Sequence, residues 1–178
     1  MDDLVPAAPW LLVGAAVVAA MASLIAGRAV PWQGRQVVLV MGAAMLATAL
    51  VGDIPMVGLV LGALLLVSAM LGTMGVRGTA AAGECFRRAL VALLLAVCSF
   101  ESAASGAAPE TRAGVHGGHG ALSGLLSVLI VAGVIGVVLW TVVADWFVEP
   151  IHHGRVARLI TTESWALAAG AALMCLAT

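Results

Sequence analysis

The stretch ECFRRALVALLLAVCSFES, residues 84–102, decides how this chain is folded. Its uninterrupted apolar part, Ala89 to Phe100, is shorter than the roughly 20 helical residues that cross a bilayer. The helix becomes long enough if it starts near Glu84 and continues through Ser102. Whether this segment crosses the membrane or turns back depends on the arginines at its beginning.

Arginines occur in alternate links between the apolar segments, and the chain has no lysine. Because basic residues gather on the cytoplasmic side of membrane helices, the alternation predicts six spans with both chain ends outside. If the fourth segment turned back, the arginines of the third and fifth links would lie on opposite sides. Arg112 alone departs from the pattern; the others are Arg28 and Arg35 in the first link, Arg77, Arg87 and Arg88 in or beside the third, and Arg155 and Arg158 in the fifth.

Composition predicts an integral membrane protein. Hydrophobic residues make up 63% of the 178 residues and charged residues 10%, whereas a soluble domain carries about 25% charged residues. The sequence predicts one all-α domain over residues 1–178, a polytopic bundle without a separate soluble part. The predicted helices cover residues 9–27, 36–51, 55–76, 85–104, 121–148 and 158–176, with an outer loop over 105–120.

The absence of Lys, Tyr and Asn, beside abundant Ala, Gly, Val and Arg, suggests a GC-rich bacterial genome. We therefore expect the protein in a bacterial plasma membrane as a multi-pass protein. The expected partners are the lipid bilayer and other membrane proteins, and not nucleic acid.

Charged residues within spans are costly and are functional candidates for that reason. Asp145 is predicted at the inner end of the fifth helix and Glu163 about one turn into the sixth. Arg155 and Arg158 are near enough in sequence to pair with both, which predicts interfacial ion pairs that hold the last two helices in register. The alternative is a proton or cation path through Glu163 and Asp145.

A second set of candidates could bind metal on the outer side. His116 and His119 of the outer loop are predicted near the helix ends that carry Met174 and Cys175. Imidazole, thioether and thiolate are ligands that select copper in its reduced state. The alternatives are solvated histidines, methionine as packing filler, and a disulfide between Cys175 and Cys98.

Small residues and methionines predict close helix packing. Gly58 and Gly62 form a GxxxG pattern, which lets membrane helices approach closely. Met41 and Met45 are four residues apart and share one helix face. Packing is the preferred interpretation of both pairs, and a pair of metal ligands is the alternative for the methionines.

The paired methionines Met41 and Met45, the segment around Met174, and the loop with His116 and His119 resemble an uncharacterised family of actinobacterial integral membrane proteins. Its helices carry a histidine followed by Met-x-x-x-Met, and a His-rich stretch separates its fourth and fifth segments. The chain departs from that pattern, because Arg35, Gln36 and Val38 occupy the region of the intramembrane histidine. The resemblance implies the architecture and assigns no activity.

The chain has no phosphate-binding glycine loop, nucleophile elbow or HExxH motif. We therefore expect no enzyme and no resident cofactor, apart from copper in the metal-binding alternative. The preferred hypothesis is an accessory or scaffold helical bundle of the plasma membrane. The two alternatives are a copper-handling protein and a small transporter or channel.

Overall fold

The computed structural model describes residues 7–27, 30–51, 54–76, 78–79, 81–106, 119–147 and 154–177. These residues form six α-helices and contain no strand, which confirms the predicted all-α class. The helices are α1 (Ala8–Ala26), α2 (Trp32–Val51), α3 (Pro55–Thr73), α4 (Ala82–Gly106), α5 (His119–Phe147) and α6 (Arg155–Ala177).

Helices α2, α4 and α6 extend farthest beyond their predicted apolar segments. Helix α2 begins at Trp32 and not at residue 36, because the Arg35 N–H already donates to the carbonyl of Pro31. Helix α6 begins at Arg155 and not at residue 158, and α4 is longer at both ends than residues 85–104. Backbone hydrogen bonds of a helix close within the segment, so polar residues at a helix end continue it where a hydropathy pattern stops.

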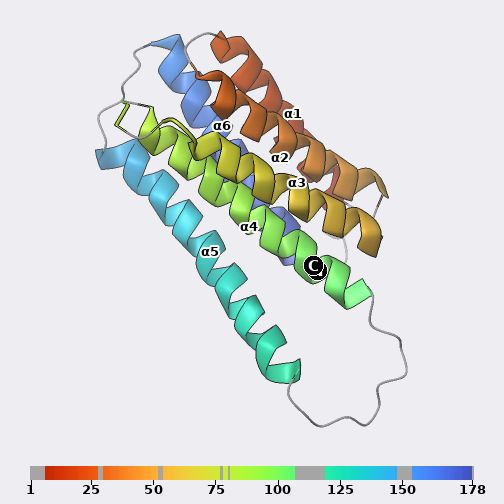
Figure 1. Cartoon of the computed structure of the whole chain (residues 1–178). Coiled ribbons are helices and arrows are strands. Elements are labelled where there is room, and N and C mark those ends of the chain that lie inside the picture. The colour runs from red at the N-terminus through yellow and green to blue at the C-terminus, as the bar shows by residue number, and fades with distance from the viewer. Residues whose placement is uncertain are drawn as a thin grey trace.

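Helix α4 lies at the centre of the bundle. It packs against α2, α3, α5 and α6, while α1 packs against α2 and α6 (Figure 1). The connections between consecutive helices alternate between the two ends of the bundle, so α2, α4 and α6 run in the same direction. Helix α5 lies along one side and packs against α4 and α6.

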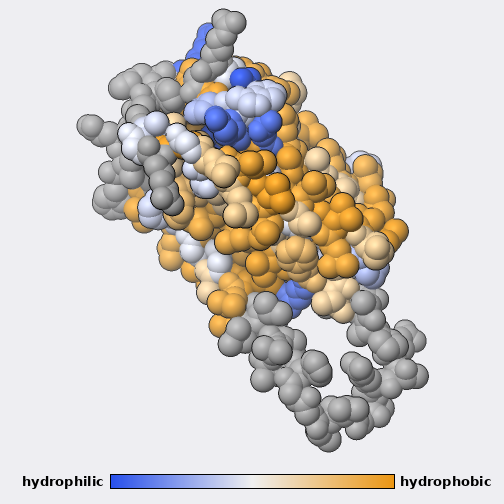
Figure 2. Space-filling model, viewed as in Figure 1, coloured by the Kyte–Doolittle hydropathy of each residue, from blue (hydrophilic) through white to orange (hydrophobic). Residues whose placement is uncertain are grey.

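Most of the outer surface is apolar. Large hydrophobic side chains are exposed along α1, α3 and α5, and the space-filling view shows hydrophobic colour over the body of the bundle (Figure 2). Hydrophilic side chains gather at the end where α2 and α6 begin. Helices α1, α2 and α3 are each long and apolar enough to cross a membrane. This surface is compatible with insertion into a bilayer.

Glycines set the distance between α3 and α4. A Cβ atom at Gly58 would lie 2.9 Å from the carbonyl oxygen of Ser99, and one at Gly62 would lie 2.7 Å from the ring of Phe100. Both glycines of the GxxxG pattern therefore face α4, and their hydrogens leave room for its backbone and for Phe100. The close contact brings α3 against the helix that carries the buried arginines Arg87 and Arg88.

Met41 and Met45 lie in the core, and neither side chain is exposed. The Sδ and Cε atoms of Met45 lie 2.8 Å from the position of a Cβ at Gly170 of α6. The methionine thus fills the space that the glycine leaves, and the two residues form the contact of α2 with α6 at this level.

Candidate functional site

A buried ion pair joins α4 to α6. The Nε atom of Arg88 donates to Oε1 of Glu163 at 2.7 Å, and the exposed fractions of the two side chains are 2% and 0%. Removal of two charges from water costs several kcal/mol for each ion, and mutual attraction repays that cost only in good geometry. A charge buried here needs its partner, so this pair fixes the position of α6 relative to α4.

The partner of Glu163 corrects the prediction that it would pair with Arg155 or Arg158. Both of those arginines are exposed at the start of α6, whereas Glu163 points into the bundle. Arg158 and Glu163 are five residues apart, which places them about 140° apart around a helix of 3.6 residues per turn. Pairs three or four residues apart face each other, and this pair does not.

Asp145, the other acidic residue of the predicted ion pairs, lies in α5 near its end. Its side chain is outside the part of the structure that is described. The pairing predicted for it therefore stays a prediction.

Neighbouring residues shape the space around the Arg88 guanidinium. Its Nη1 atom would lie 2.9 Å from a Cβ at Gly34 of α2, so the absence of a side chain there gives the guanidinium room. Cys85 is buried beside it as a free thiol. The adjacent Arg87 forms an ion pair with Glu84, which lies one turn earlier on the same helix. The first two turns of α4 thus hold two arginines, each paired with a carboxylate.

Two atoms of the buried pair have no hydrogen-bond partner, Nη2 of Arg88 and Oε2 of Glu163. Buried polar atoms are nearly always satisfied in proteins, so each exception needs a physical account. Arg88 also lines a small cavity of about 10 Å³ between α4, α5 and α6. The cavity and one of the unpartnered atoms thus belong to the same side chain.

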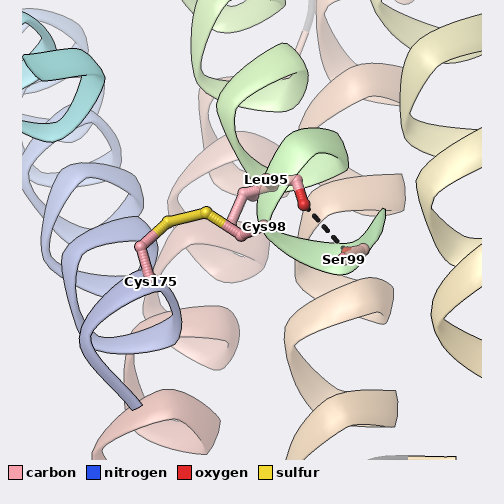
Figure 3. Close-up of a disulfide and its surroundings, with 4 residues drawn as sticks. All are labelled: Leu95, Cys98, Ser99 and Cys175. Carbon is pink, nitrogen blue, oxygen red and sulfur yellow. Dashed lines mark hydrogen bonds between the residues drawn. A yellow bond between two sulfur atoms is a disulfide. The ribbon is translucent and has the colours of Figure 1, made fainter. Parts of the chain in front are cut away.

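A disulfide joins the same two helices farther along. Cys98 of α4 and Cys175 of α6 are bonded, with their Cα atoms 5.7 Å apart (Figure 3). Next to it the hydroxyl of Ser99 donates to the carbonyl of Leu95, within α4. The sequence predicted this disulfide as one alternative to a metal site. Helices α4 and α6 are tied twice, by charge near their beginnings and by a covalent bond toward their ends.

The disulfide removes one member of the predicted copper set. Cys175 has no free thiolate, and the thiolate is the form that binds a metal. Met174 is buried, with 3% of its surface exposed. His116 lies outside the described residues, and His119 is described as the first residue of α5 without its side chain. Within the described residues, no group of three or more His, Cys, Asp or Glu side chains is placed to hold a metal.

Sequence reasoning missed Arg88 as a core residue, although a signal was available. Arg88 lies on the same face of α4 as Ala92, Leu95 and Ser99, at spacings of four, three and four residues, and all four are buried. Such spacing marks one helix face. An arginine on the buried face of a central helix requires an acid from another helix, and Glu163 supplies it.

Comparisons with known proteins add no relative: no family model, no curated protein and no solved structure matches the chain. The resemblance to the actinobacterial membrane family therefore stays a prediction.

Proposed function

We propose that the chain is a multi-pass membrane protein of six spans, with both ends outside the cytoplasm, and acts as a non-catalytic accessory or scaffold subunit of a bacterial plasma membrane. Helices α1, α2 and α3 have the length and composition of spans. The other three extend through the same bundle, and α4 and α5 reach 25 and 29 residues. Those lengths exceed the roughly 20 residues that a bilayer requires.

Two independent rules support the same orientation. Seven arginines lie in the links before α2, α4 and α6 or in the first two turns of these helices, and basic residues at helix ends stay on the cytoplasmic side. The disulfide lies toward the opposite ends of α4 and α6. Disulfides persist in oxidising compartments such as the outer side of a bacterial membrane and are rare in the cytosol. Both the arginines and the disulfide thus favour an orientation in which α2, α4 and α6 begin on the cytoplasmic side and end on the outer side.

The double connection of α4 to α6 carries the proposal of a structural role. The buried charges bind each other, and two of the three cysteines are covalently joined. A driven transporter needs ionisable groups that change partners, whereas a scaffold needs helices that keep their positions. The ionised side chains and cysteines of these two contacts connect helices. The exposed apolar faces can contact lipid and neighbouring membrane proteins.

Reporter fusions test the topology. A fusion at Gly78, in the link between α3 and α4, should report the cytoplasm, and one at Gly118, before α5, should report the outer side. Reports from the same side would mean that α4 does not cross, and the six-span arrangement would then be abandoned.

Reconstitution tests the structural role against transport. Vesicles that contain the purified chain should conduct protons and monovalent cations no faster than empty vesicles. A flux that disappears in Glu163→Gln would contradict the scaffold and favour the transporter. In membranes of its own host, the tagged chain should migrate on a native gel above the mass of one chain in its micelle, and migration as a lone chain would also contradict the proposal.

A further inference from the structure

A small cavity lies beside the buried ion pair, where α4, α5 and α6 meet. Its volume of about 10 Å³ holds one oxygen-sized atom, and it is open on one side. The lining residues are two arginines and an aliphatic residue from α4, a hydroxyl from α5, and a hydroxyl and an aliphatic residue from α6: Arg87, Arg88, Val91, Thr141, Ser164 and Leu167.

Arg87 and Arg88 contribute guanidinium groups to the wall of the cavity. Nε donates to Glu163, and Nη1 lies against Gly34 of α2. Nη2 is buried and has no hydrogen-bond partner. Arg87 adds a second guanidinium to the wall of the cavity. Guanidinium nitrogens form strong, charge-assisted hydrogen bonds with phosphate oxygens. The two guanidinium groups in the wall of the cavity therefore favour an anionic oxygen as the occupant.

The two hydroxyls allow the same ligand. Thr141 donates to the carbonyl of Val137 at 2.8 Å, and Ser164 donates to the carbonyl of Ile160 at 2.7 Å. Each of these bonds lies within one helix, and a hydroxyl hydrogen turns to the better acceptor. The wall can thus give further donors to a negatively charged oxygen without any movement of the backbone.

The position of the cavity along the helices matches the depth of lipid headgroups. Thr141 follows Trp140 in α5, and Ser164 precedes Trp165 in α6; both tryptophans are exposed. Exposed tryptophans gather at the membrane–water interface. The hydroxyls of the cavity therefore lie at the level where phosphate groups of lipids are found.

The charge at this end of the bundle favours anions. Its described residues include five arginines, which are Arg35, Arg87, Arg88, Arg155 and Arg158, and three acidic residues, which are Glu84, Asp145 and Glu163. The excess is two positive charges, and it comes from the other arginines, because Arg87 and Arg88 are paired with Glu84 and Glu163. Basic pockets between membrane helices on the cytoplasmic side bind anionic headgroups.

We propose that this cavity binds a phosphate oxygen of an anionic phospholipid of the inner leaflet, through Arg87 and Arg88. The choice of the inner leaflet rests on the proposed orientation. One phosphate oxygen enters between α4, α5 and α6, while the rest of the headgroup stays at the interface and the acyl chains lie along apolar side chains. A bound lipid would join α5, which lies along one side of the bundle, to the two helices that are already tied together.

Binding to the full chain in dodecyl maltoside micelles tests the site. Dioctanoyl phosphatidylglycerol should raise the Tm by about 2–4 °C, and dioctanoyl phosphatidylcholine and inorganic phosphate should not. Arg87→Met should weaken the Kd for phosphatidylglycerol by about 10-fold, since charge-assisted bonds are lost. The matched control Arg158→Met removes the same charge from an exposed position at the same end, and its Kd should change less than about 2-fold.

Three results would overturn the site: equal losses in Arg87→Met and Arg158→Met, equal effects of phosphatidylglycerol and phosphatidylcholine, or an equal Tm rise with inorganic phosphate. The last would assign the cavity to a soluble anion. If Arg87→Met does not fold, Thr141→Val removes one donor without a change of charge and should weaken binding by about 3-fold; an unchanged Kd would also overturn the site.

The micelle assay is independent of membrane orientation, which separates the two proposals. Absent lipid binding together with the predicted fusion results overturns the lipid site and leaves the proposed function intact. A fusion at Gly78 that reports the outer side overturns the proposed orientation, whatever the lipid assay gives.

Discussion

Arg88 of α4 and Glu163 of α6 are 75 residues apart in sequence and 2.7 Å apart between Nε and Oε1. Neither side chain is exposed by more than 2%. Since the two charges neutralise each other in the interior, each is tolerated only while the other is present. The bundle is therefore sensitive to the loss of either partner.

Loss of one partner should destabilise the protein strongly. We expect Glu163→Ala to lower the free energy of unfolding by about 3–5 kcal/mol, because Arg88 is left as an uncompensated buried charge. The double variant Arg88→Met/Glu163→Leu should lose much less, since no charge remains. Titration with SDS, followed by tryptophan fluorescence, measures these values. Arg158→Ala is the exposed control, and a double variant less stable than Glu163→Ala would contradict the prediction.

The oxidation state of the cysteines can be counted. After denaturation without reductant, a maleimide coupled to polyethylene glycol should add one unit per chain, at Cys85, and three units after reduction. In Cys85→Ala the unreduced protein should add none. Addition of three units to the unreduced wild type would show that Cys98 and Cys175 are not bonded.

A methyl group at Gly58 should separate α3 from α4. Its Cβ would lie 2.9 Å from a backbone oxygen, which cannot move aside as a flexible side chain can. We expect Gly58→Ala to cost about 1–3 kcal/mol of unfolding free energy. Gly14→Ala is the matched control, because no atom beyond its chain neighbours and its own helix backbone lies within 4 Å of its Cβ, and it should be neutral or stabilising by roughly 0.5–1 kcal/mol. Equal effects of the two substitutions would argue against the close contact.

Substitutions at Met45 distinguish a packing role from metal binding. If it fills space against Gly170, Met45→Ala should cost about 2–5 kcal/mol, whereas Met45→Leu keeps most of the volume and should cost less than about 1.5 kcal/mol. Metal analysis of the purified wild type and Met45→Leu checks the alternative. Copper that is present in the wild type and absent from Met45→Leu would favour Met41 and Met45 as a pair of metal ligands.

The sequence predicted the number and order of the helices because lipid imposes a simple condition: each span needs about 20 apolar residues. The ends were predicted less well. The hydropathy pattern ended at polar residues such as Gln33 and Arg35, but these continue α2, since its backbone bonds do not depend on side-chain polarity.

Of the two contacts between α4 and α6, the ion pair was not predicted, and the disulfide was predicted only as an alternative to a metal site. The residues of each pair, Arg88 with Glu163 and Cys98 with Cys175, lie more than 70 positions apart. Whether two such residues come into contact depends on which helices pack together, and the hydrophobic periodicity of a sequence does not determine this. Arg158 is close to Glu163 in sequence and was predicted as its partner, but the two residues lie on different sides of α6.

The bond between Cys98 and Cys175 also sets an order of events during synthesis. In the proposed topology Cys98 arrives on the outer side with α4, but its partner arrives only after α5 and α6 have entered the membrane. Until then the thiol of Cys98 has to stay reduced in an oxidising compartment, or be oxidised and released again. Closure of the 77-residue loop is therefore a late step, and a chain that carries the bond has already inserted α6.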